Sequence, residues 1–156
     1  MIFSSSANGL DLETEVPNVS ALDYSGEVLN VSEFARDGFA LVFFFPKAET
    51  PGCIAQVCSL RDAFEELTEE GVRVLGVSTD SVLKQKTFHE KRSLPYPLIA
   101  DVDKVVVKAF GVPTTFGFAS RQAYLFKDGK LVWKDESAAT KKQAEEVLAV
   151  VRSISG

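Results

Sequence analysis

Apolar residues come in short, separate runs along the chain, and the spacing within each run predicts a strand or a helix. Residues 39–45 are continuously apolar, which is typical of a strand that is covered on both faces. Between residues 53 and 67 the apolar positions recur every three to four residues, so this stretch predicts a helix with one buried face. Residues 72–78 predict the next strand, and residues 81–91 predict a weaker helix. A strand, a helix and a further strand in this order form a βαβ unit, which implies a parallel sheet.

Shorter patterns lie on both sides of this unit. A turn-rich segment is flanked by residues 19–22 and 27–30. This pattern predicts a small hairpin that precedes the core in the sequence. Ser32 is the expected N-cap of a short helix that follows the hairpin. After the unit, residues 98–100 predict a short strand, and residues 101–110 predict one brief helix.

The last third of the chain completes the predicted fold. Residues 122–127 and 130–134 are apolar runs joined by an Asp-Gly turn, which is a strong hairpin signal, and residues 138–154 predict an amphipathic helix. An antiparallel hairpin added to a βαβ unit is the plan of a thioredoxin-like α/β fold, with a central mixed β-sheet flanked by helices and an N-terminal β-hairpin. Because the sequence contains no internal repeat and no linker, we expect a single domain over residues 1–156.

Composition and charge narrow the classes of function. The chain has 17 basic and 22 acidic residues, a net charge of −5, so it lacks the electrostatic footprint of a protein that binds nucleic acid or an anionic membrane. Residues 1–10 lack the basic start and long apolar stretch of a secretory signal. The apolar run 39–45 is too short to span a bilayer. We therefore expect a cytoplasmic protein, with an organellar protein whose transit peptide has been removed as the alternative.

The two cysteines of the chain carry the chemical signal, because two are too few for a secreted disulfide framework. Both lie in the segment that follows the first buried strand and opens the first long helix. At that position Thr50 is the expected N-cap, Pro51 fits the first helical residue, and Cys53 falls in the first turn. Backbone amides and the positive end of the helix dipole favour an anion there, so Cys53 is the candidate nucleophile. The alternative is that Cys53 is a small hydrophobic residue of the core.

The spacing of the two cysteines argues against a structural disulfide. Cys58 follows Cys53 by five residues, which places it roughly 140° further around a helix and about 8 to 9 Å away between Cα atoms. A disulfide needs Cα atoms less than about 7 Å apart. The spacing instead suits a pair that is helical when reduced and rearranged when oxidised.

The motif Pro46-x-x-x-Thr50-x-x-Cys53 resembles the active-site signature of the peroxiredoxins. Thr50-Pro-Gly-Cys53 followed by Cys58 resembles the bacterioferritin-comigratory-protein or PrxQ subfamily, and the likeness extends over most of the chain, including Arg121. The resemblance implies the thioredoxin-like fold and a thiol peroxidase that reduces hydrogen peroxide and organic hydroperoxides. It implies neither a cofactor nor a metal.

The same resemblance implies a role for each residue of the motif. Cys53 is the expected peroxidatic cysteine, which becomes a sulfenic acid, and Cys58 is the expected resolving cysteine, which forms an intramolecular disulfide that thioredoxin or glutaredoxin reduces. Thr50 is expected to contact the peroxide, Pro46 to shield the thiolate, and Arg121 to stabilise the thiolate and the transition state. Because the resolving cysteine lies in the same helix, we expect a monomer.

Two other classes of function stay open at this stage. A thioredoxin-like thiol-disulfide oxidoreductase would exchange the cysteine pair with protein disulfides and react slowly with peroxide. A non-enzymatic binding domain on the same fold would carry two ordinary thiols, since a fold does not determine a function.

Single residues outside the motif add little. The one histidine, His89, is far in sequence from both cysteines and is interpreted as part of a solvated helix face rather than as a catalytic base. With two cysteines and one histidine, the chain has too few ligands for a Cys/His metal site. Phe116 and Phe118 are expected to fold onto the core, with an exposed apolar collar near the active site as the alternative.

Overall fold

A five-stranded mixed sheet, in the order β5-β4-β3-β8-β9, forms the centre of the computed structural model, which describes residues 9–155. Its strands are β3 (Phe39–Phe44), β4 (Val72–Ser78), β5 (Leu98–Ala100), β8 (Gln122–Lys127) and β9 (Lys130–Asp135). Strands β3, β4 and β5 run parallel to one another, whereas β8 and β9 pair in the antiparallel sense. The predicted thioredoxin-like plan is confirmed.

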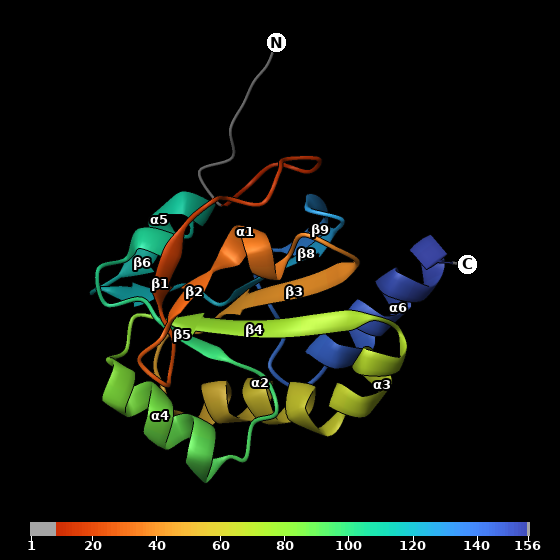
Figure 1. Ribbon diagram of the computed structural model, residues 1–156. Helices are drawn as coiled ribbons and strands as arrows, with labels where there is room; N and C mark the ends of the chain where they lie inside the picture. Colours follow the sequence, from red (N-terminus) through yellow and green to blue (C-terminus); the bar gives the residue numbers. More distant parts are fainter. Residues whose placement is uncertain (1–8, 156) are drawn as a thin grey trace.

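Helices cover both faces of this sheet (Figure 1). One face carries α2 (Pro51–Asp62), α3 (Phe64–Glu69), α4 (Val82–Lys91) and α6 (Gln143–Ser155). The other face carries α1 (Val31–Phe34), α5 (Val105–Phe110) and the N-terminal hairpin of β1 (Ser20–Leu22) and β2 (Val28–Asn30). A second hairpin, β6 (Thr114–Thr115) with β7 (Phe118–Ala119), was not predicted.

The continuous apolar run of β3 follows from its central position. Leu41 and Phe43 point into the core cluster under α2 and α6, whereas Val42 and Phe44 point into the cluster under α1 and α5. Side chains alternate between the faces of a strand, so a strand with a core on each side is apolar at every position. Packing on both faces therefore holds β3 in place, and the carboxyl end of β3 leads into α2.

Two predicted helix starts are wrong, and side-chain hydrogen bonds explain the difference. The N-cap of α1 is Asn30, whose Oδ1 accepts from the backbone N of Glu33 at 2.8 Å, and not Ser32. The helix expected over 101–110 begins only at Val105. The Asp101 carboxylate stands before it and accepts from the backbone N–H groups of its second and third residues.

The helices on the α2 side of the sheet also differ from their predicted bounds. The helix predicted from 53 to 67 is interrupted at Ala63, where α2 ends and α3 begins. The helix predicted over 138–154 starts at Gln143, because the backbone N of Ala138 donates to Arg121 O at 3.0 Å rather than entering a helix. The segment before α6 is therefore bonded to Arg121, the residue that immediately precedes β8.

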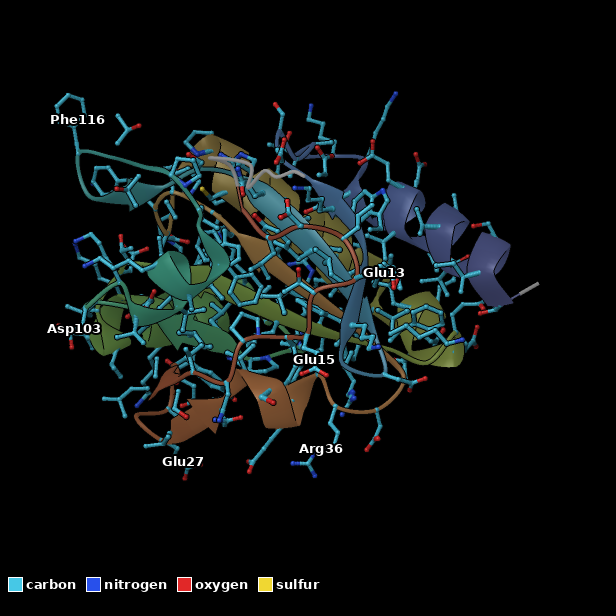
Figure 2. The ribbon with its side chains drawn as sticks, turned by 90° about the horizontal axis from the view of Figure 1, so that it is seen from above. Glu13, Glu15, Glu27, Arg36, Asp103 and Phe116 are labelled. Carbon is cyan, nitrogen blue, oxygen red and sulfur yellow. The ribbon has the colours of Figure 1, made fainter. Side chains whose placement is uncertain are left out.

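Phe116 and Phe118 do not fold onto the core, so that expectation is wrong. Phe116 is 95% exposed at the tip of the β6–β7 hairpin and points away from the protein (Figure 2). Phe118 is partly exposed, with Lys47 Nζ 5.6 Å from the centre of its ring.

His89 does not lie on a fully solvated helix face, as was predicted. Its ring stacks on Tyr24 with 3.7 Å between the ring centroids, and its burial lowers its pKa.

Within the described residues, no helix is long and apolar enough to cross a membrane. The expectation for the N-terminal segment 1–10 falls almost entirely on residues 1–8, which lie outside the described part.

Gly76 in β4 provides a test of how tightly the sheet packs under α2. A Cβ at this position would lie 2.7 Å from Leu98 Cδ2 and 2.8 Å from Phe43 Cζ. We expect Gly76→Ala to lower the free energy of unfolding by about 1 to 3 kcal/mol, which is the usual cost of overpacking. Calorimetric melting measures the loss, and the same change should cost less in a Leu98→Ala background, where the neighbour has been shortened. An equal cost in both backgrounds would contradict the packing explanation.

Candidate active site

The loop between β3 and α2 is tied to the neighbouring strand β4. The backbone N of Phe45 donates to Val77 O at 3.0 Å. Further along, the backbone N of Ala48 donates to Asp80 Oδ2 at 2.8 Å, and the same oxygen accepts from Ser78 Oγ at 2.6 Å. Because Asp80 is 8% exposed, these bonds lie out of solvent and give the loop a fixed path to the helix.

Glu49 links the end of this loop to α4. Its carboxylate lies 3.0 Å from Lys91 Nζ and 3.1 Å from Arg92 Nε. Burial by itself would raise the pKa of Glu49, but the hydrogen bonds and positive charges of Lys91 and Arg92 lower it overall. The backbone of Glu49 has a φ of 64°, a left-handed conformation that is uncommon outside glycine. The ion pairs therefore hold a strained residue directly before Thr50.

Thr50 is the N-cap of α2, as predicted, but its side chain does not cap the helix. The backbone N of Ile54 donates to Thr50 O at 2.8 Å, while the Thr50 hydroxyl turns back and donates to Lys47 O at 2.7 Å. Pro51 occupies the first helical position, where a missing N–H costs nothing. Pro46 is half-buried and lies two residues after the end of β3.

Cys53 lies in the first turn of α2 and contacts Arg121. Cys53 is 0% exposed, and Arg121 Nη1 lies 3.5 Å from its Sγ. Arg121 immediately precedes β8 and is 68 positions from Cys53 in the sequence. A Cβ at Gly52 would lie 3.0 Å from Arg121 Nη2, so glycine allows the guanidinium to lie close against the helix. The structure thus brings Cys53 and Arg121 together, and the cation beside the sulfur disfavours the interpretation of Cys53 as an ordinary core residue.

Two buried glutamines orient this guanidinium. Arg121 Nη1 donates to Gln56 Oε1 at 2.7 Å, and Gln56 Nε2 donates to Gln143 Oε1 at 2.8 Å. Gln56 and Gln143 are both 0% exposed, which strengthens each bond through the low local dielectric. The chain of bonds runs from the first residue of α6 through α2 to the sulfur contact.

Sequence reasoning missed both glutamines. Gln56 follows Cys53 by three residues and therefore shares its side of the helix, a signal that was present in the sequence. Gln143 is 87 positions from Gln56, and no local pattern marks it.

Cys58 lies one and a half turns further along α2. Both cysteines are free, and Cys58 is half-buried where Cys53 is fully buried. Cys58, Ser59, Lys141 and Glu145 line part of a cavity of about 490 Å³ between α2 and α6. Because α2 is helical over both cysteines, their Cα atoms stand about 8 to 9 Å apart by helix geometry, and the two sulfurs cannot bond in this conformation.

The arrangement can stabilise negative charge at one sulfur. The helix N-terminus and the Arg121 guanidinium both favour an anion at Cys53, and the neighbouring donors are held in place by the glutamines. Over residues 9–155, no group of three or more His, Cys, Asp or Glu side chains is placed to hold a metal ion.

Comparison with known proteins agrees with this geometry. Residues 12–134 match the model of the AhpC/TSA family. A stretch of 96 residues, 62% of the chain, is 46% identical to peroxiredoxin Bcp of Escherichia coli strain K12 and covers 61% of that protein. A longer stretch, 88% of the chain, is 33% identical to the chloroplastic peroxiredoxin Q of Oryza sativa subsp. japonica and covers 65% of it. The matched part thus spans between three fifths and two thirds of these relatives.

Solved structures lead to the same family. The crystal structure of peroxidoxin BcpB from Mycobacterium tuberculosis superposes with a TM-score of 0.84 at 32% identity, covering 92% of this chain and 97% of that one. The PrxQ structure from Xylella fastidiosa superposes with a TM-score of 0.86 over 94% of this chain and 98% of that one, and at 21% identity it supports the fold alone. The chain therefore belongs to the AhpC/TSA family of peroxiredoxins.

Proposed function

We propose that the chain is a thiol peroxidase that reduces hydrogen peroxide and organic hydroperoxides, with Cys53 as its nucleophile. The observation that carries the proposal is the contact of Arg121 with Cys53 in the first turn of α2, where Nη1 lies 3.5 Å from Sγ. A guanidinium and a helix N-terminus favour negative charge, and both the attacking thiolate and the departing oxygen carry it. Membership of the AhpC/TSA family and the likeness to proteins named peroxiredoxin Bcp and peroxiredoxin Q support the same function.

In the oxidising step, the Cys53 thiolate attacks one peroxide oxygen. The S–O bond forms, the O–O bond breaks, and the other oxygen leaves and takes up a proton to become water or an alcohol. Cys53 is oxidised to a sulfenic acid while the peroxide is reduced by two electrons. Because Cys53 is fully buried, the peroxide reaches its sulfur by displacing neighbouring side chains.

The surrounding groups have separate roles in this step. The Thr50 hydroxyl donates its proton to Lys47 O, so its lone pairs are directed to accept the O–H of the peroxide. The N–H groups of Gly52 and Cys53 precede the first intrahelical bond and, together with Arg121, supply donors for the departing oxygen. Pro46 is half-buried, and its place in the peroxiredoxin motif supports the proposal that its ring shields the thiolate from water.

In the resolving step, the Cys58 sulfur attacks the sulfur of the Cys53 sulfenic acid. The S–S bond forms, the S–O bond breaks, and the hydroxyl leaves with the proton of the Cys58 thiol as water. A dithiol protein of the thioredoxin or glutaredoxin class then reduces the disulfide by exchange, which restores both thiols. In the reduced protein Cys58, unlike Cys53, is only partly buried and lines the cavity between α2 and α6.

A resolving cysteine on the same helix removes the need for a second subunit, so we propose a monomer that acts as a single domain. The proposed cycle requires a supply of reducing dithiols, which supports a reducing compartment such as the cytoplasm.

Replacing each of the two cysteines is expected to stop the reaction at a different step. Cys53→Ser should abolish peroxide consumption because the nucleophile is lost. Cys58→Ser should allow one rapid oxidation and then stop at the sulfenic acid, which a sulfenic-acid-specific probe and mass spectrometry detect. Equal loss of the first oxidation in both variants would contradict the assigned roles. Slow oxidation by peroxide together with rapid exchange with protein disulfides would identify a thiol-disulfide oxidoreductase instead.

Arg121→Ala is expected to slow Cys53 oxidation by about 10²- to 10³-fold, the usual cost of losing one donor to a developing negative charge. The rate should be measured by stopped flow up to the pH at which it no longer rises, so that only transition-state stabilisation is compared. Arg121→Lys should recover part of the rate, since an ammonium keeps the charge but lacks the planar fork.

Arg152→Ala is the matched control for this arginine. Arg152 lies on the surface and pairs with Glu66 and Glu70, so its loss should leave the oxidation rate unchanged. If Arg121→Ala equalled the parent on the high-pH plateau, Arg121 would have no role in the transition state.

A further inference from the structure

We propose that Tyr96 is a positioning residue for the resolving step: its hydroxyl holds the peptide unit that leads into Cys58 and thereby limits how fast Cys58 reaches the Cys53 sulfenic acid. The inference rests on the proposed function, because it concerns the second half of that reaction. Nothing in the peroxiredoxin motif includes Tyr96.

The contact is a single buried hydrogen bond. Tyr96 Oη donates to Val57 O at 2.7 Å, and both residues are buried. The carbonyl of Val57 and the N–H of Cys58 belong to one planar peptide unit, so the bond fixes the orientation of the backbone that enters Cys58. For Cys58 to approach Cys53, this plane must rotate and the bond must break.

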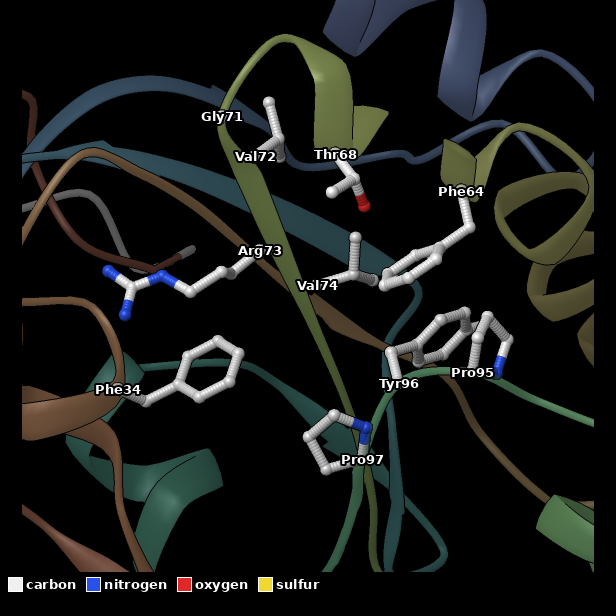
Figure 3. Close-up of a pocket in the computed structure, with 10 residues that line it drawn as sticks. All are labelled: Phe34, Phe64, Thr68, Gly71, Val72, Arg73, Val74, Pro95, Tyr96 and Pro97. Atoms are coloured by element: carbon white, nitrogen blue, oxygen red, sulfur yellow. The ribbon is translucent and has the colours of Figure 1, made fainter. Parts of the chain in front are cut away.

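The donor stands on a rigid support. Tyr96 lies between Pro95 and Pro97, whose rings fix their own φ angles and restrict the residue before each of them. Pro97 is joined to the sheet, since the backbone N of Gly76 donates to Pro97 O at 3.1 Å. Figure 3 shows Tyr96 flanked by the two prolines with the ring of Phe64 beside it, in the wall of a cavity of about 380 Å³. The hydroxyl therefore cannot easily follow α2 when the helix moves.

Packing and burial keep the hydroxyl in place as a donor. The ring contacts Phe43 edge-on at 5.8 Å and Phe64 at 6.1 Å between centroids. Burial raises the pKa of Tyr96 well above its ordinary value. The phenol thus keeps its proton throughout the neutral pH range and remains bonded to Val57 in the reduced protein.

The bond affects the partition of the Cys53 sulfenic acid between two reactions. In one, Cys58 attacks its sulfur, a disulfide forms and water leaves. In the other, the sulfenate sulfur attacks a second peroxide, whose O–O bond breaks, and Cys53 is oxidised to a sulfinic acid while the peroxide becomes water or an alcohol. Holding Cys58 in the helix slows the first reaction and leaves the second unchanged.

Tyr96→Phe tests the proposal with little disturbance, because it retains the ring and removes only the donor. Val57 O also faces the backbone N of Arg61 in the helix, so the variant leaves no buried carbonyl without a partner. Reduced protein is mixed with one equivalent of hydrogen peroxide to follow sulfenic acid and disulfide, and with increasing excesses of peroxide to follow sulfinic acid. Each sample is quenched by alkylation and analysed by mass spectrometry. Tyr124→Phe is the matched control, since its hydroxyl donates to Gln122 and its ring lies on the other face of the sheet.

We expect disulfide formation in Tyr96→Phe to be about 2- to 10-fold faster, the factor by which one net hydrogen bond shifts an equilibrium. The peroxide concentration that converts half of Cys53 to sulfinic acid should rise by the same factor, while the rate of the first oxidation stays as in the parent. Amide exchange at Cys58 in the reduced protein should also increase, and this measurement does not depend on catalysis.

An equal or slower resolving rate in Tyr96→Phe, or an equal acceleration in Tyr124→Phe, would overturn the role of Tyr96 while the first oxidation still supports the peroxidase. Loss of the first oxidation in the parent chain itself would instead overturn the proposed function, and with it this inference.

Discussion

One regular helix carries both cysteines, and the rest of the site depends on that constraint. With Cys53 in the first turn of α2 and Cys58 five residues later, helix geometry keeps the two sulfurs out of bonding range. The helical state places Cys53 at the positive end of the dipole beside Arg121, which suits attack on a peroxide. The disulfide state requires the same turns to open. Each half of the proposed reaction therefore needs a conformation that the other half excludes.

The contacts of α2 reflect these two requirements. The loop that leads into the helix is fixed at two points. Asp80 accepts a hydrogen bond from the loop backbone, and Glu49, at the end of the loop, forms ion pairs with the end of α4. The helix itself is held by separate side-chain bonds, from Gln56 to the start of α6 and from Tyr96 to the Val57 carbonyl. Bonds of this kind are each worth about 1 kcal/mol, so they hold the helix closed while still allowing it to open. A rigid frame thus surrounds a segment that can rearrange.

The sequence predicts the frame better than the details of the site. The unbroken apolar run of β3 and the Asp-Gly turn between β8 and β9 are local signals, and both elements lie where they were predicted. Cys53 and Thr50 also follow from their position at a helix start. Arg121 is different, because its contact with Cys53 joins residues 68 positions apart, and only the family resemblance identified it.

The features that were missed arise from tertiary contacts. Gln143 has no neighbouring signal in the sequence and acquires its role only when α6 packs against α2. The late start of α6 has the same origin, since the backbone of Ala138 bonds to Arg121 instead of beginning a helix. Phe116 was expected on the core, with an exposed apolar collar as the alternative, but it lies in the two-residue turn between β6 and β7 and is exposed to solvent. Periodicity describes how one element is buried, and it contains no information about which distant side chain that element meets.

The most direct test of the two-state helix is amide exchange over residues 50–60 in the reduced protein and in a form whose Cys53–Cys58 disulfide has been verified by mass. If the sulfurs can bond only after the first turns of α2 unwind, the amides of this segment should exchange much faster in the disulfide form, while those of β3 and β4 stay protected. Equal protection of residues 50–60 in both forms would show that the disulfide forms without unwinding, and that the helix does not keep the sulfurs apart.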